Sequence, residues 1–201
     1  MSISKQLKKL NLVTGKKTLE VFEKSFPKIL TETYVSEAAF VRKFWKKYKK
    51  TFPKASNALN GHVFEALLAI ILYRSGIKPI YVQANLEFVP NVDFDFVGYS
   101  KECGPVVLSA KTSLRERYKQ ADLEGRFMKQ VHQKARCYLI TLEASEARTV
   151  NAKVDEGQTL GIDRAVVMNG PKFDDLIKEL KAMTFIIPEK VQILTGKRMI
   201  K

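Results

Sequence analysis

Apolar and lysine residues alternate with helical spacing in the first quarter of the chain. Phe40, Phe44 and Tyr48 recur every four positions, which is the period of one helix face. Pro53 interrupts this pattern because proline does not continue a helix. Residues 1–55 are therefore predicted to form two or three short basic helices.

The most apolar segment is NALNGHVFEALLAIILYR, residues 57–74. Its length and composition predict a largely buried helix, ended by Gly76 in the left-handed position after the last turn. Glu65 lies inside this helix, so its carboxylate is expected at the edge of the hydrophobic core. A buried carboxylate needs a partner, which makes Glu65 a candidate functional residue.

Shorter apolar runs follow this helix, and turn-like residues separate them. The three runs at 80–88, 92–99 and 105–111 are predicted to form an antiparallel meander. A long helix at 114–134, strands at 137–142 and 165–169, and a last helix at 172–183 come next. This order predicts an α/β fold with a central mixed β-sheet flanked by helices, and one domain over residues 1–201.

The charge of the chain points to a polyanionic partner. Lys and Arg number 35 against 21 Asp and Glu, which gives a net charge of +14 and a pI near 9.7. The run KFWKKYKKTFPK, residues 43–54, could grip phosphates, or it could be an amphipathic helix whose lysines extend into solvent. Glycine-rich nucleotide loops are absent from the sequence, so no small-molecule substrate is expected.

The remaining composition indicates a reduced, soluble setting. Cys103 and Cys137 are too few for a disulfide framework and form no CxxC pair, so free thiols are expected. The first residues show no secretory pattern, and the longest apolar run, residues 66–73, is too short to span a bilayer. We therefore expect a cytoplasmic protein that is not bound to a membrane.

Charged side chains interrupt two neighbouring strands of the predicted meander. Strand alternation puts Asp93 and Asp95 on one face of their strand, and Ser109 and Lys111 on one side of the next. A lysine there would be costly to bury without a carboxylate such as Asp95 beside it. Carboxylates can hold a hard cation and a lysine can polarise a phosphate, so the group suits phosphodiester hydrolysis. An ordinary ion pair at a sheet edge is the alternative.

The order of these elements resembles the PD-(D/E)XK nuclease superfamily. The resemblance covers roughly residues 57–145 and rests on a helix with Glu65, a strand with Asp95, a strand ending in SAK, and a following helix. The segment SAKTSLRERYKQADLE is similar in particular to type II restriction endonucleases. This implies a restriction-endonuclease-like sheet, Mg²⁺ as cofactor, Asp95 as a metal ligand and Lys111 as the motif lysine, with Asp93 as a second choice of ligand.

Ser109 departs from the pattern because it stands where the superfamily usually has its second acidic residue. In a variant group of restriction enzymes this acid lies on the helix after the lysine. Glu124 lies thirteen residues past Lys111, which is the spacing of that group. The resemblance therefore implies Glu124 as the second metal ligand, Ser109 as neutral support, and Glu65 as a further acidic contributor.

Polar residues at the start of the predicted helix 114–134 are candidates for DNA contact. Arginine reads guanine, glutamine reads adenine, and glutamate accepts from cytosine. Two like charges four positions apart, Arg115 and Lys119, are unfavourable in an isolated helix, which favours an anionic partner over a merely solvated face. The expected DNA-contacting residues are Ser113, Arg115, Glu116, Arg117, Lys119 and Gln120.

These features predict a type II restriction endonuclease that hydrolyses double-stranded DNA at specific sites with Mg²⁺. Residues 57–145 would be its catalytic core and residues 1–55 a basic helical subregion. A homodimer is expected, because a two-fold axis matches two strands of a palindrome. The alternatives are a repair or junction-resolving nuclease of the same superfamily, and a basic DNA-binding module that has lost catalysis.

Overall fold

Five strands form one mixed sheet in the computed structural model, which describes residues 1–86, 89 and 92–189. The strands lie in chain order across the sheet. They are β1 (Ile80–Ala84), β2 (Phe94–Ser100), β3 (Gly104–Ala110), β4 (Arg136–Thr141) and β5 (Arg164–Val167). β1, β2 and β3 are antiparallel, whereas β3, β4 and β5 are parallel. The predicted meander and mixed sheet are confirmed.

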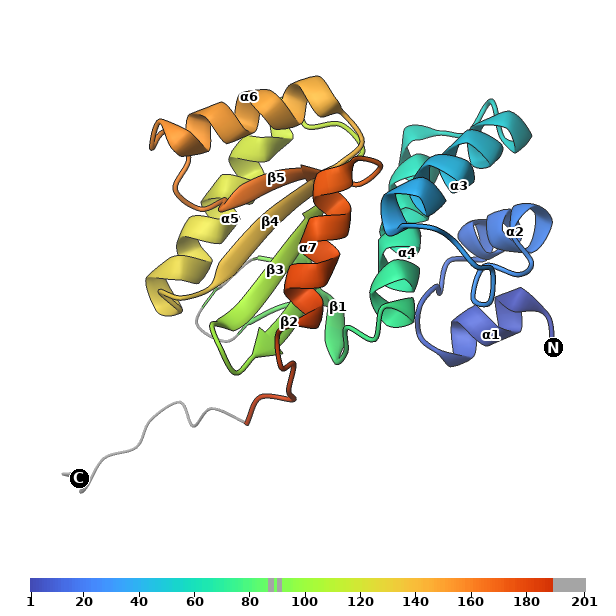
Figure 1. Ribbon diagram of the computed structural model, residues 1–201, viewed down its shortest axis with the longest axis horizontal. Coiled ribbons are helices and arrows are strands. Elements are labelled where there is room, and N and C mark those ends of the chain that lie inside the picture. The colour runs from blue at the N-terminus through green and yellow to red at the C-terminus, as the bar shows by residue number, and fades with distance from the viewer. Residues whose placement is uncertain (87–88, 90–91, 190–201) are drawn as a thin grey trace, which may run out of the picture.

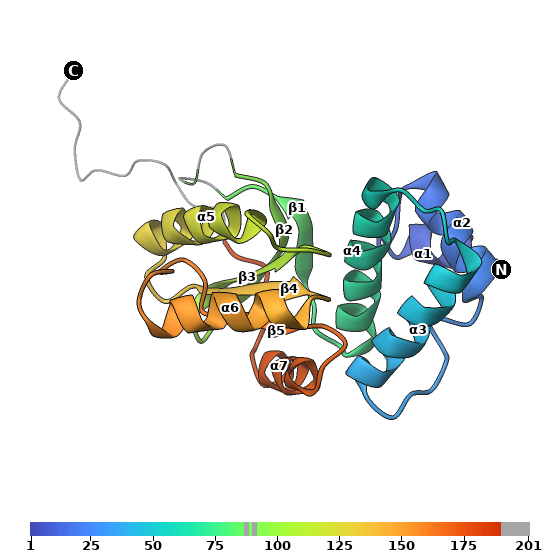
Figure 2. The ribbon, with the colours of Figure 1, turned by 90° about the horizontal axis from the view of Figure 1, so that it is seen from above.

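Helices cover both faces of the sheet (Figures 1 and 2). α5 (Arg117–Val131) and α6 (Ala144–Asp155) pack on one face, where Val107 and Leu139 point. α4 (Asn57–Arg74) and α7 (Pro171–Lys181) lie on the side of Leu108 and Ile140. Buried side chains that alternate along β3 and β4 therefore contribute to two hydrophobic layers, one on each face of the sheet.

α4 is the central helix of the molecule. It lies between the sheet and a layer of three N-terminal helices, α1 (Ile3–Lys9), α2 (Lys16–Ser25) and α3 (Glu37–Thr51) (Figure 1). The Ser56 hydroxyl accepts a hydrogen bond from the backbone N–H of Leu59, and Gly76 follows the helix with φ of +75°. Since α4 is covered on both sides, it buries apolar residues around most of its circumference. Its predicted bounds and its burial are confirmed.

The aromatic residues of α3 point into the protein. Phe44 and Tyr48 are fully buried, and the Phe44 ring stacks on Phe26 with a centroid distance of 4.2 Å. Lys47 lies over the Phe26 ring and Lys49 over the Trp45 ring. The rings of the KFWKKYKKTFPK run therefore build the core, and the helix is amphipathic, with its lysine stems along the apolar face.

Several element ends differ from the prediction. The strand expected over 80–88 ends at Ala84, and residues 87–88 lie outside the described residues. The helix expected over 114–134 begins at Arg117, because Glu146 accepts the backbone N–H groups of Leu114 and Arg115 and holds a turn there. Helix α6 was not predicted. Within the described residues, none of the helices has the length and apolar character needed to cross a membrane.

Candidate active site

Asp95 and Lys111 form an ion pair at one end of the sheet. Asp95 is the second residue of β2, and Lys111 directly follows the last residue of β3. The Lys111 Nζ lies 2.9 Å from Asp95 Oδ2, and the backbone N–H of Ala110 donates to the same oxygen at 2.8 Å. Asp95 is only 8% exposed. Among the described residues no hydrogen-bond donor reaches Oδ1, so this oxygen is available to a ligand.

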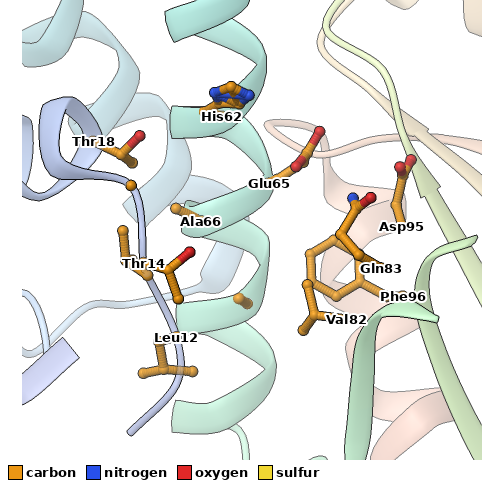
Figure 3. Close-up of a pocket in the computed structure, with 13 residues that line it drawn as sticks. Leu12, Thr14, Thr18, His62, Glu65, Ala66, Val82, Gln83, Asp95 and Phe96 are labelled. Atoms are coloured by element: carbon orange, nitrogen blue, oxygen red, sulfur yellow. The ribbon is translucent and has the colours of Figure 1, made fainter. Parts of the chain in front are cut away.

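Glu65 approaches this pair from α4. Burial raises the pKa of its carboxyl above the ordinary value, the charge of Asp95 raises it further, and His62 and Lys111 lower it. Glu65 and Asp95 line the same cavity, and Figure 3 shows the Glu65 carboxyl turned towards the side of α4 on which Asp95 lies. A half-buried carboxylate with an acidic neighbour is a common feature of functional sites.

Glu124 approaches the pair from α5, on the opposite face of the sheet. Burial raises the pKa of its carboxyl, whereas a 2.7 Å hydrogen bond from the Gln120 amide and the charge of Lys111 lower it. The charges of Asp95 and Asp93 raise it again. The charges of Asp95 and Lys111 therefore act on both predicted acids, Glu65 of α4 and Glu124 of α5.

The position of α5, which carries Glu124, depends on a close contact between two backbones. A Cβ atom on Gly125 would overlap the carbonyl of Gly161, which lies in the loop before β5. Asp122 Oδ1 accepts the backbone N–H of Gly161 at 2.6 Å. Glycine is required here because only its backbone can approach so closely, and this contact fixes α5 against the sheet one residue from Glu124.

A cavity of about 510 Å³ opens beside these side chains. Glu65 and His62 of α4 and Asp95 of β2 line it, together with β1 and the segment that leads into α2 (Figure 3). The cavity therefore lies between the sheet and the N-terminal helices. Polar side chains from both sides reach it, which is the arrangement expected of a substrate cleft.

The strand alternation predicted for Asp93 does not extend to it. β2 begins at Phe94, and Phe94 packs with Val97 in one hydrophobic cluster, whereas regular alternation would separate them. Asp93 is exposed and accepts a 2.6 Å hydrogen bond from the Asn85 amide. Asp95 is thus the buried carboxylate of the strand. Ser109 is 6% exposed within β3, two residues before Lys111.

The predicted DNA-contacting residues lie in the turn after β3 and on the first turn of α5. Arg115 and Glu116 precede the helix, and Arg115 has a left-handed φ of +36°. Glu116 pairs with Lys119, and Gln120 is bound to Glu124. Ser113 is half-buried, and the other five residues are exposed: Arg115, Glu116, Arg117, Lys119 and Gln120.

The sequence did not indicate three polar residues of the cavity. Gln83 has a φ of +50° and lies opposite Asp95, between the Val82–Phe96 and Ala84–Phe94 pairs, so its backbone departs from the extended strand conformation although the register is regular. Its amide lies between Glu65 and Asp95 (Figure 3). His62 is exposed and lines the cavity from α4, and Thr18 lines it from α2.

The side chains around the ion pair suit a hard cation in chemistry but form only part of a coordination shell. The acidic groups provide carboxylate oxygens, which Mg²⁺ prefers. In the part of the chain that the structure describes, no three His, Cys, Asp or Glu side chains are gathered as a complete metal cluster. Mg²⁺ usually takes one or two protein carboxylates and completes its shell with water and substrate phosphate, so Asp95 and Glu124 fit this ion.

The fold is similar to that of a known nuclease. The search of solved structures finds "Restriction endonuclease PspGI-substrate DNA complex", with a TM-score of 0.51 and 15% sequence identity over 90% of this chain and 80% of that chain. No protein-family model and no curated protein matches the sequence. The chain thus has the restriction-endonuclease-like fold that its sequence predicted.

Proposed function

We propose that this protein is an Mg²⁺-dependent type II restriction endonuclease that hydrolyses double-stranded DNA at specific sites. The observation that carries this proposal is the buried Asp95–Lys111 ion pair at the end of β2 and β3, whose charges act on Glu65 of α4 and on Glu124 of α5. Its support is the similarity of the fold to a restriction endonuclease whose structure contains substrate DNA. The net charge of +14 favours the same substrate.

Asp95 and Glu124 would hold the metal ion, with Asp93 as the alternative ligand. Asp95 would use Oδ1, since Oδ2 already accepts hydrogen bonds from Lys111 and Ala110. When bound, Mg²⁺ supplies positive charge to the scissile phosphate and to the oxygens around it. Ser109 adds no charge to this set, which leaves the second acidic position to Glu124.

Lys111 would stabilise the charge that develops on the phosphate. Its ammonium group has three N–H donors, and the structure uses one of them on Asp95. The remaining donors can reach a phosphate oxygen, where positive charge lowers the barrier most in a site that excludes water. Asp95 orients the lysine through this hydrogen bond, so removing either residue should disable the other.

Glu65 would accept the proton of the attacking water. Burial raises its pKa, and a carboxylate with a raised pKa is a stronger base at neutral pH. The water oxygen forms a bond to phosphorus while the bond to the 3′ oxygen breaks, and the leaving oxygen takes a proton from solvent. The products are a 5′-phosphate and a 3′-hydroxyl end.

The residues around the start of α5 would contact the DNA beside the site. Arg115, Arg117 and Lys119 carry positive charge on an exposed surface, so they can grip phosphates or read guanine. Ser113, Glu116 and Gln120 complete the predicted contact set. Because Gln120 also binds Glu124, a base contact at Gln120 would be linked directly to the metal ligand.

Cutting both strands of a duplex requires two active sites. We propose a homodimer whose two-fold axis coincides with that of a palindromic site. Residues 1–201 would form one nuclease domain, with residues 57–145 as its core and the basic helices of residues 1–55 beside the cleft.

Digestion of a plasmid with the purified protein and Mg²⁺, followed by sequencing of the ends, tests this function. Discrete fragments with a common sequence at their ends are expected. Cuts confined to branched or damaged DNA would instead indicate a repair or junction-resolving enzyme. Binding of the plasmid without any cutting at any salt concentration would indicate a DNA-binding module without catalytic activity.

A further inference from the structure

A side chain of α6 holds the turn that connects β3 to α5. Glu146 lies in the first turn of α6. Its carboxylate accepts the backbone N–H of Leu114 at 2.6 Å through Oε2 and the backbone N–H of Arg115 at 3.2 Å through Oε1. Hydrogen bonds to a carboxylate are stronger than those between neutral groups. A charged group from a later element therefore fixes two successive peptide units of this turn.

Apolar packing attaches the same turn to the same helix. The side chain of Leu114 is 1% exposed and belongs to one hydrophobic cluster with Ala147 and Val150 of α6. Glu146 directly precedes Ala147, so neighbouring residues of α6 supply the hydrogen bonds and part of the apolar contact. Movement of the turn would break both kinds of interaction. The position of the turn therefore depends on α6.

Arg115 combines a strained backbone with an exposed side chain. Its φ of +36° lies in the left-handed region, which residues other than glycine rarely adopt. Among the described residues no acidic side chain forms a salt bridge with Arg115, whereas the nearby Lys119 pairs with Glu116. Strained conformations persist only where their surroundings hold them, and they are frequent at ligand-binding sites. The hydrogen bonds to Glu146 supply the restraint, and the exposed guanidinium can serve a ligand.

We propose that Glu146 is a positioning residue for DNA recognition, which holds Arg115 in the conformation in which its guanidinium contacts the duplex. This proposal rests on the proposed function, because it takes double-stranded DNA as the ligand of Arg115. Glu146 itself would not contact DNA, since both of its oxygens accept from the backbone and its charge repels phosphate. Arg115 lies four residues after Lys111, so a fixed turn also sets the DNA contact relative to the ion pair.

The direction of the change in DNA affinity separates positioning from simple electrostatics. Loss of a negative charge reduces the repulsion between protein and phosphate, so it should tighten binding. The Glu146→Gln variant should do the opposite, because its amide cannot accept two backbone N–H groups as the carboxylate does. We expect binding to a synthetic duplex in Ca²⁺ to weaken several-fold. This loss should be smaller than the roughly tenfold loss expected for Arg115→Ala.

Two matched variants separate charge from geometry. Glu143→Gln removes the same charge from the N-cap of α6, where the side chain is exposed and makes no capping hydrogen bond. Its duplex affinity should be unchanged or slightly higher. Glu146→Asp keeps the charge, but its side chain is shorter by one methylene group, so it should hold the turn less well. Weaker binding by this variant at constant net charge is expected, and it serves as the test if Glu146→Gln proves unstable.

A double-mutant cycle with Arg115→Ala distinguishes a positioning role from a merely structural one. If Glu146 acts through Arg115, Glu146→Gln should cause no further loss of duplex affinity once Arg115 has been replaced. The melting temperature should still fall in both backgrounds, because the hydrogen bonds to the turn are lost in each. A residue that only stabilises the fold would lower the melting temperature without this dependence of affinity on Arg115.

Unchanged or tighter binding by Glu146→Gln, or equal losses with and without the Arg115 side chain, would overturn the positioning role. Failure of the proposed function gives a different result, because binding in Ca²⁺ needs no cleavage. Wild-type protein that binds and cuts DNA, with Glu146→Gln binding equally well, refutes the positioning role alone. Wild-type protein that binds without cutting, with a loss that depends on Arg115, refutes the nuclease and supports the positioning role.

Discussion

Three half-buried glutamates, Glu179 on the one hand and Glu65 and Glu124 on the other, differ in how completely the fold compensates their charge. Glu179 of α7 accepts hydrogen bonds from the Tyr138 hydroxyl and from Arg164, whose nitrogen lies 2.6 Å away. Burial alone would raise the pKa of Glu179, but these two partners lower it below the ordinary value. This carboxylate is stabilised by the folded protein.

Glu65 and Glu124 show the opposite balance. Burial is the largest effect on each carboxyl, and it raises the pKa of both. Lys111 acts on both but is hydrogen-bonded to Asp95, and the other acids of the site oppose it. The fold therefore holds the carboxylates of Glu65 and Glu124 without enough positive charge nearby to balance them. A group of this kind is expected where a ligand, such as a cation, completes the compensation.

The Asp95→Asn variant should show the largest effect. Asparagine retains an oxygen for the backbone N–H of Ala110, so the fold should persist, but the charge that orients Lys111 and would bind Mg²⁺ is lost. We expect the cleavage rate to fall roughly a thousandfold, with duplex binding in Ca²⁺ largely intact. A single-turnover cleavage assay and fluorescence anisotropy measure the two quantities. Normal turnover in this variant would exclude Asp95 from the site.

Glu124→Gln should reduce cleavage roughly a hundredfold, because α5 would no longer supply a metal ligand. Asp93→Asn is the matched variant, since it removes the same charge from an exposed residue that already binds Asn85. We expect its effect to be smaller when both rates are measured as a function of Mg²⁺ concentration. Full activity of Glu124→Gln together with an inactive Asp93→Asn would reverse the assignment of the two ligands.

Glu65→Gln should lower cleavage while it raises stability. The folded-state pKa of Glu65 lies above its unfolded value of about 4.5, so the folded protein binds more protons between these two pH values. Stability therefore falls as the pH rises through this window, and the cost persists at neutral pH. Thermal unfolding in EDTA across the acidic-to-neutral range should show a higher melting temperature for Glu65→Gln at neutral pH. Equal melting curves for the wild type and Glu65→Gln would indicate that the charge of Glu65 does not destabilise the folded protein.

Glu179→Gln should have the smallest effect on cleavage and the opposite effect on stability. The lowered pKa means that Glu179 stabilises the fold above its unfolded pKa, and that this contribution is lost as the pH falls through the folded pKa. Its side chain is 38% exposed, so solvent screening limits the loss to about 1 kcal/mol. Urea unfolding measures this loss. A strong decrease in cleavage by Glu179→Gln would contradict the distinction between Glu179, whose charge the fold compensates, and Glu65 and Glu124, whose charge it does not.

The sequence predicted the parts of the fold that follow from regular hydrophobic spacing. The central helix was predicted over Asn57–Arg74, as observed, because its apolar run is long and ends at Gly76. The order of strands around Asp95 and Lys111 followed from short apolar runs. α6 was missed because its sequence, ASEARTVNAKVD, has only Ala147 and Val150 buried, which gives a weak periodic signal.

Regular hydrophobic spacing also allowed part of the candidate site to be predicted. Asp95, Lys111 and Glu65 lie on regular elements, so their faces could be inferred, whereas their roles and that of Glu124 rest on resemblance and stay predictions. Gln83 could not be found because its left-handed backbone, which strand alternation does not anticipate, breaks the regular side-chain pattern of β1 at the cavity. Thr18 was missed because tertiary packing alone brings α2 to the cleft.

Cleavage of supercoiled plasmid by wild-type and Lys111→Ala protein, purified in parallel, tests most directly whether the Asp95–Lys111 pair is catalytic. In Mg²⁺ the wild type should convert the plasmid to linear fragments, and EDTA should stop the reaction. Lys111→Ala should leave the plasmid supercoiled while still binding a duplex in Ca²⁺. Equal cleavage by the two proteins, or none by the wild type under any divalent metal, would contradict a nuclease centred on Lys111.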